Sequence, residues 1–285
     1  MEIRSILVHL DPLPHTASRV ATAAALARQH EAHLVGLAPT GWITMPADYT
    51  GLLGVSEFIV PAIQMQRELA EASVQRFEAQ VRSLGLSSYE GRVDHEDVAT
   101  SMSLAARYCD LSIVTQTEPG NFSAEQQSGM PESVLLHSGR PVLVLPYAES
   151  AETTFVMPPE GHVLVAWDGG REAARAMHDA LPLLRQARSV EVAVFEVPHE
   201  VDPRHGPLPG ADIGLWLARH GIRVEARRVH SEIPVGEALL SHAADIGAQL
   251  IVAGGYGHTR LRETVLGGVT RTLLRSSPVP LLLSH

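Results

Sequence analysis

Short, continuous runs of apolar residues recur along the chain, separated by stretches with helical spacing. Runs of this kind, bounded by turn residues, are typical of parallel strands buried on both faces. In the first half the pattern predicts strands at 6–11, 32–37, 89–93, 111–114 and 142–145, and helices at 17–29, 61–84 and 98–108. In the second half it predicts strands at 162–168, 190–197, 222–229, 250–253 and 281–283, and helices at 171–186, 235–246 and 268–275. The same order of elements therefore occurs twice.

This repeat divides the chain into two domains. A length of 285 residues suits two domains better than one. A stretch rich in Pro, Glu, Ser and Thr separates the two passes, as a linker would. We predict a first domain at 1–148, a linker at 149–160 and a second domain at 161–285. Each domain is expected to be an α/β unit of the doubly wound, Rossmann-like type, with a five-stranded, mainly parallel sheet.

The charged residues exclude several chemistries. All 22 residues counted as Lys or Arg are arginine, so the chain has no lysine. A P-loop needs a lysine on its phosphates, and a Schiff-base enzyme needs an amine nucleophile, so neither class fits. The formal net charge of −10 and the lack of an arginine cluster disfavour a nucleic-acid surface. Small ligands and proteins are the expected partners.

The cysteine count and the N-terminal sequence indicate a reducing compartment. The single cysteine, Cys109, cannot form an internal disulfide, and residues 1–10 lack the basic-then-apolar pattern of a signal peptide. We therefore expect a cytoplasmic protein. The partly apolar stretch 52–65 is interrupted by polar residues and by Pro61, and it is shorter than the roughly 20 residues of a membrane span. We predict a buried helix or loop there, and a core position for Cys109.

A glycine-rich loop after the strand at 250–253 is the main candidate for binding chemistry. Gly254, Gly257 and Gly267 follow the pattern G-x2-G-x9-G, and Gly268 opens the last helix. Glycines let the backbone approach a phosphate closely, and a helix N-terminus offers unpaired N–H groups and a positive dipole. The loop is predicted to hold phosphate without a lysine. Turn chemistry alone is the competing interpretation.

This loop resembles that of the universal stress protein family, whose nucleotide-binding members carry the same spacing followed by Ser or Thr. The resemblance covers nearly the whole chain as two copies. It implies a stress-response module that binds ATP in its second domain. Whether Mg²⁺ accompanies the ATP is left open. The alternative is a scaffold or chaperone-like dimer that binds no nucleotide. A variant of this alternative binds a hydrophobic ligand in the first domain. Slow ATP hydrolysis is less favoured. The family also implies dimers that form by pairing of the last strands. In a tandem chain, the two halves of one chain can make this pairing instead.

The resemblance assigns roles position by position in the second domain. Gly254 and Gly257 would face the phosphates and ribose, and Gly267, Gly268 and Val269 would hold the phosphates. Asp168 would lie near the adenosine, and the backbone of Val197 would meet the adenine. Ala253 and Thr270 complete the candidate set. Because Asp168 precedes two glycines, a strand-ending turn is an equally open interpretation of that residue.

The chain departs from the family pattern at Gly268, where a hydroxyl residue is expected. Losing one hydrogen bond to a charged group costs about 1.5 to 3 kcal/mol, which is roughly a ten- to hundredfold loss of affinity. Thr270 is a candidate substitute. In the first domain, the stretch 116–131 lacks the paired glycines and carries Glu118 and Glu125, which would repel phosphate. We predict that this domain has a structural or interaction role.

Two further groups of polar residues remain open. One group flanks the glycine loop, and its members either bind phosphate or are simply solvated: His258, Arg260, Arg262 and Arg271. The other has ligand-type side chains in an irregular, proline-containing loop, where a metal is disfavoured: His199, Glu200, Asp202 and His205. We predict neither a metal site nor a catalytic residue.

Overall fold

The computed structural model describes residues 2–41, 55–121, 129–147, 155, 161–196, 210–257 and 268–285. Strands and helices alternate through both halves. The elements of the first half are β1 (Ser5–His9), α1 (Thr16–His30), β2 (His33–Pro39), α2 (Val55–Ser83), β3 (Tyr89–Asp94), α3 (Val98–Ala106), β4 (Leu111–Thr115), α5 (Met130–Ser138) and β5 (Val142–Leu145). Those of the second half are β6 (His162–Ala166), α6 (Arg171–Leu184), β7 (Ser189–Glu196), α7 (Ala211–Arg219), β8 (Val224–His230), α8 (Val235–Asp245), β9 (Leu250–Gly254), α9 (Gly268–Ser276) and β10 (Leu281–Ser284).

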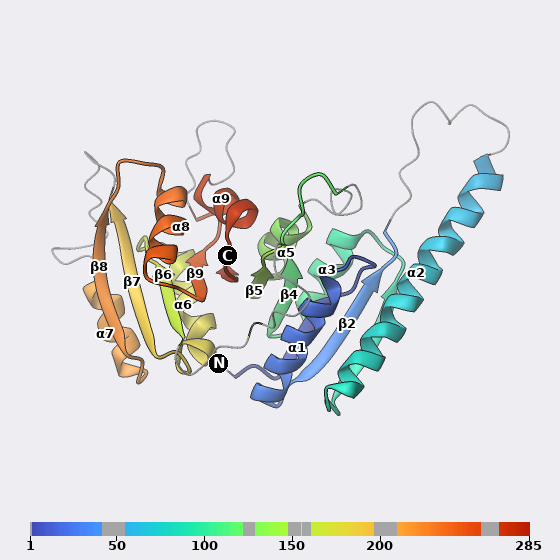
Figure 1. The fold of residues 1–285 in the computed structure, drawn as a ribbon, viewed down its shortest axis with the longest axis horizontal. Coiled ribbons are helices and arrows are strands. Elements are labelled where there is room, and N and C mark those ends of the chain that lie inside the picture. Colours follow the sequence, from blue (N-terminus) through green and yellow to red (C-terminus); the bar gives the residue numbers. More distant parts are fainter. Residues whose placement is uncertain are drawn as a thin grey trace.

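The strands form one ten-stranded sheet in the order β3-β2-β1-β4-β5-β10-β9-β6-β7-β8. All neighbours within each half are parallel, which confirms the predicted α/β fold class. The halves meet at an antiparallel pair in which Leu143 of β5 lies opposite Leu282 of β10. The two halves of the sheet thus run in the same order outward from this central pair, as Figure 1 shows.

Helices cover both faces of the sheet (Figure 1). One buried apolar cluster contains residues of α1, α2, α6 and α7, and the other contains residues of α3, α5, α8 and α9. Successive strand residues alternate between the clusters, as Ile6 and Leu7 do, because neighbouring side chains of a strand point to opposite faces. Both clusters include residues from both halves, so the hydrophobic core is continuous across the central strand pair.

Three local features differ from the prediction. Helix α2 begins at Val55, six residues before the predicted start, and continues through Pro61. Its first part extends past the end of β2 (Figure 1), and Val60, Ile63 and Met65 are each more than half exposed. The prediction of a buried segment was therefore wrong for these residues, because among the described residues this part of the helix extends past the sheet. Helices α5 and α7 were not predicted.

No helix among the described residues has the length and apolar character required to cross a membrane. Cys109 is buried next to the apolar cluster of α3 and α5, as predicted. Burial raises the pKa of its thiol to about 11, which keeps it in the protonated, unreactive form at neutral pH.

Candidate functional site

The candidate site lies where the strand order of the second half reverses direction, between β6 and β9. Ala166 of β6 and Ala253 of β9 are register partners in this parallel pair. Asp168 follows β6 by two residues, and Gly254 ends β9. In doubly wound sheets, ligands bind in the crevice beyond the carboxyl ends of strands at such a switch point. The fold therefore brings the two main predicted segments to one edge of the sheet.

Asp168 shapes the turn that leads from β6 into α6. Its Oδ1 accepts a hydrogen bond of 2.8 Å from the backbone N–H of Gly170. Gly169 has a φ of +70°, which glycine adopts without steric cost. Asp168 thus has the turn role that the sequence left open, and this does not exclude a contact with a ligand, because its side chain is only half-buried.

Gly254 and Gly257 are packed closely against the start of α6. A Cβ atom on Gly254 would lie 2.5 Å from the backbone nitrogen of Ala173, and one on Gly257 would lie 2.6 Å from Oε2 of Glu172. At Gly254 the neighbours are backbone atoms, so only glycine fits there, whereas at Gly257 the neighbour is the end of a flexible side chain that can shift. Gly254 therefore has a packing reason that is independent of any phosphate.

Glu172 is a residue that the sequence analysis did not single out. It is the second residue of α6, it is 4% exposed, and its Oε1 accepts a hydrogen bond from Nε of Arg171. Burial by itself would raise the pKa of this carboxyl, but the hydrogen bonds from Arg171 and from the backbone outweigh it and lower the pKa. A buried, ionised carboxylate therefore faces the glycine turn.

The turn itself is fixed by contacts from α9 and from the first half. The backbone N–H of Tyr256 donates to Oγ1 of the buried Thr270 at 3.1 Å. Tyr256 has a φ of +55°, an uncommon conformation for a residue with a side chain, and burial together with Glu132 raises the pKa of its phenol to about 12. A Cβ on Gly255 would lie 2.6 Å from Cδ2 of Leu135 in α5. The candidate loop is thus supported by both halves of the chain.

The start of α9 leaves room where the family pattern has a hydroxyl. A Cβ on Gly268 would meet nothing within 4 Å, and Gly268 and Val269 are both exposed. The oxygen of Thr270 points instead toward the turn, as its bond to Tyr256 shows. Several predicted positions lie outside the described residues: Val197, His199, Glu200, Asp202, His205, His258, Arg260, Arg262 and Gly267. In the part of the chain that the structure describes, no group of three or more metal-ligating side chains is found.

The corresponding crevice of the first half is filled by an arginine. Arg19 is 1% exposed, and its Nη2 donates to Asp11 at 2.8 Å, its Nη1 to Oγ1 of Thr115 at 2.7 Å, and its Nε to the carbonyl of His9 at 2.8 Å. Asp11 follows β1 by two residues, as Asp168 follows β6. The cavity beside this network is about 20 Å³, which is room for about one water molecule.

This network also has a distinct electrostatic character. Burial would raise the pKa of Asp11, but Arg19, His9 and Thr16 together hold it well below its usual range. Burial lowers the pKa of His9 to about 4, so the ring is neutral at pH 7. The buried ion pair lies at the place in the first half that corresponds to the Asp168 turn of the second half. That the first half has no nucleotide site stays a prediction. Of the two acidic residues in that prediction, Glu118 accepts a hydrogen bond from Asn121, and Glu125 lies outside the described residues.

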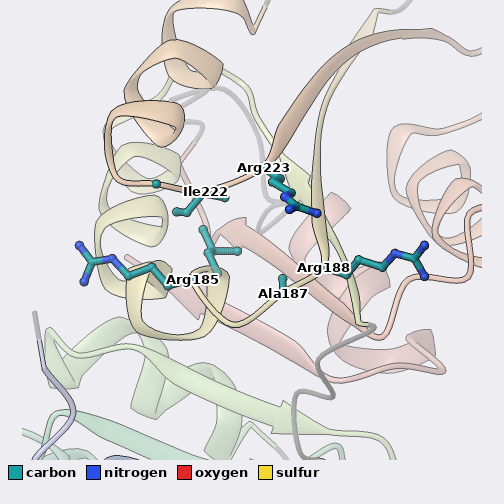
Figure 2. A pocket seen from close by; sticks show the side chains of 7 residues that line it. Arg185, Ala187, Arg188, Ile222 and Arg223 are labelled. Atoms are coloured by element: carbon teal, nitrogen blue, oxygen red, sulfur yellow. The ribbon is translucent and has the colours of Figure 1, made fainter.

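A separate shallow hollow of about 490 Å³ lies at the opposite edge of the sheet, before the first residues of β7 and β8. Arg185, Arg188 and Arg223 line it together with buried apolar residues. Figure 2 shows that Arg188 and Arg223 extend to one side and Arg185 to the other. The three guanidinium groups do not converge on one point, so we assign no ligand to this hollow.

Comparison with known proteins agrees with the fold. The model of the universal stress protein family matches residues 161–285. Universal stress protein YxiE of Bacillus subtilis (strain 168) is 24% identical over 143 residues, which are 42% of this chain and 96% of that protein. A universal stress protein from Archaeoglobus fulgidus DSM 4304 has the same fold with a TM-score of 0.67 and 18% identity, covering 99% of this chain and 96% of the other. A functionally unknown protein from Pseudomonas aeruginosa PAO1 has a TM-score of 0.59 and 16% identity, covering 99% and 92%.

The fold defines a doubly wound α/β protein with a repeated topology. Within that class, residues 161–285 match the model of the universal stress protein family, and the whole chain has the fold of a solved universal stress protein.

Proposed function

We propose that this protein is a nucleotide-binding, stress-response module whose ligand site lies in its second half, with ATP, alone or with Mg²⁺, as the first ligand to test. One arrangement carries the proposal: Asp168, the glycine turn and the start of α9 all lie around the switch point between β6 and β9. This is the place at which open α/β sheets bind their ligands. The family membership of residues 161–285 supports the same assignment.

The proposed contacts follow from the backbone groups at this crevice. The first N–H groups of α9, including those of Gly268 and Val269, have no partner within their own helix and would donate hydrogen bonds to a phosphate. Gly254 and Gly257 would border the phosphates and ribose, and Asp168 would contact the adenosine. Ala253, Gly267, Thr270 and the backbone of Val197 complete the proposed site.

Calorimetric titration with ATP and with adenosine, each with and without Mg²⁺, tests the proposal. Because a Cβ on Gly268 meets nothing, Gly268→Ser can restore the missing hydroxyl without disturbing its neighbours, and Gly268→Ala is its matched control. We expect Gly268→Ser to bind ATP roughly tenfold more tightly than the natural protein and Gly268→Ala to bind about as the natural protein does. If folded natural protein and both variants bind neither ligand, the proposed function is wrong.

A ligand-free scaffold is the second candidate. One observation favours it: Arg19 occupies the first-half crevice, and the cavity that remains beside it has room for about one water molecule. Failure of every nucleotide to bind would support this role. The predicted homodimer, cytoplasmic location and hydrophobic ligand of the first half stay predictions.

A further inference from the structure

Glu172 places a negative charge beside the turn that borders the proposed phosphate position. Its side chain is 5% exposed and lies at the N-terminus of α6, where the helix dipole favours an anion. Its partner Arg171 has a side chain that is 83% exposed. The carboxylate is therefore on the inner side of this ion pair, and the guanidinium is largely in solvent.

The distances place this carboxylate directly against the glycine turn. A Cβ on Gly257 would be 2.6 Å from Oε2 and 3.2 Å from Cδ of Glu172. The backbone of Gly254 is equally close to the first turn of α6, with 2.7 Å from its Cβ position to the carbonyl carbon of Glu172. The space between the start of α6 and the turn is thus filled by a side chain of the protein.

This carboxylate is ionised at neutral pH. Although burial opposes ionisation, the hydrogen bonds from Arg171 and from the backbone, with the nearby His285, keep the pKa of Glu172 below its usual value. A phosphate chain entering along the turn would approach a like charge in a poorly solvated place, where such repulsion is strong. A ligand with few phosphates, or none, would avoid it.

We propose that Glu172 determines the ligand preference of the second-half site, selecting adenosine or a nucleoside monophosphate over ATP. The inference rests on the proposed function, because it concerns the same site. The N-terminus of α6 is already neutralised by this internal anion, so it does not add to the binding of a polyphosphate. Neutralising Glu172 would remove the discrimination without changing the shape of the side chain.

The test is the affinity of the natural protein and of Glu172→Gln for adenosine, AMP and ATP, by calorimetry, with and without Mg²⁺. The matched control is Glu237→Gln, which removes the same charge from the first turn of α8 at an exposed position. We expect adenosine to bind the natural protein and Glu172→Gln alike, and ATP to bind Glu172→Gln at least tenfold more tightly than the natural protein. Glu237→Gln should keep the natural preference. Thermal unfolding of each variant verifies that it is folded.

The alternative outcomes separate this inference from the proposed function. Equal ATP affinity in natural protein and Glu172→Gln would overturn the role of Glu172 and leave the nucleotide site standing. Weaker binding of ATP with Mg²⁺ by Glu172→Gln would also overturn it, because Glu172 would then be assisting the metal-bound ligand. Absence of binding for all three ligands in both proteins would overturn the proposed function itself.

Discussion

Leu135 of the first half lies directly beside Gly255 of the second half. A Cβ at position 255 would be 2.6 Å from Cδ2 of Leu135, and Leu135 is 1% exposed. The two residues belong to different halves of the chain and are separated in sequence by the linker. The candidate loop of the second half therefore packs against a residue of the first half.

A double-mutant cycle measures this contact. Gly255→Ala should reduce the free energy of unfolding by about 1 to 3 kcal/mol through overpacking against Leu135. Leu135→Ala should reduce it by about 2 to 5 kcal/mol through the cavity it leaves. In the double variant the new methyl group enters that cavity, so the combined loss should be at least about 0.5 kcal/mol smaller than the sum. Urea unfolding followed by circular dichroism gives the three values.

The control for the cycle is Gly268→Ala combined with Leu135→Ala, because a Cβ on Gly268 meets nothing. Those two changes should be additive. Additivity in the Gly255 pair as well would contradict the packing of the loop on α5.

Breaking the buried ion pair of the first half should strongly destabilise the protein. Arg19→Met leaves the carboxylate of Asp11 buried with no guanidinium partner, which should cost about 3 to 5 kcal/mol. Replacing both residues, as Arg19→Met with Asp11→Leu, should cost less than Arg19→Met alone, because no uncompensated charge remains. Urea unfolding again provides the measurement.

Arg67→Met is the comparison, since Arg67 pairs with Glu71 on the surface of α2 at 2.8 Å and both side chains are about half exposed. Exposed pairs of this kind contribute about 0.3 to 0.5 kcal/mol. If Arg19→Met were as mild as Arg67→Met, the filled crevice would not be a stabilising feature of the fold.

The sequence predicted most of the strands because they are buried on both faces and therefore appear as continuous apolar runs. Strand β8 was predicted despite exposed charged residues, since it occupies the same place in the repeat. Helix α5 was not predicted, although Pro131 near its start and Gly139 after its end are ordinary boundary signals. The apolar and polar residues of this segment are not separated onto opposite faces, so the sequence shows no clear helical period.

The candidate site was predictable only in part. The positions of Asp168 and the glycines follow from strand ends, which apolar runs reveal. The role of Glu172 depends on how closely α6 packs against β9, and the role of Arg19 depends on reaching Thr115, which is 96 residues away in sequence. Neither contact has a local signature. The direction of the Thr270 hydroxyl is likewise set by the turn at Tyr256.

The buried His9 predicts how stability depends on pH. Burial lowers its pKa to about 4 in the folded protein, whereas the ordinary pKa of a histidine is 6.5, so between these values the unfolded chain binds more protons. Stability should therefore fall as the pH falls from about 6.5 to about 4. The groups that face His9 are Asp11, which raises its pKa, and Arg19 and His15, which lower it. Protonation of Asp11, whose pKa is held below its usual range, extends the loss to lower pH.

His9→Gln separates this contribution from that of other histidines, because burial also lowers the pKa of His15 and His30. In both proteins the free energy of unfolding should drop between pH 7 and pH 4. The drop in His9→Gln should be smaller than that in the natural protein by about 2 to 3 kcal/mol. His33→Gln, which removes a 40% exposed side chain from the same half, should retain the natural slope. Urea titrations at several pH values give both slopes. Equal slopes in His9→Gln and the natural protein would show that His9 is not held neutral in the first-half crevice. Burial beside the Arg19 network would then not lower the pKa of His9.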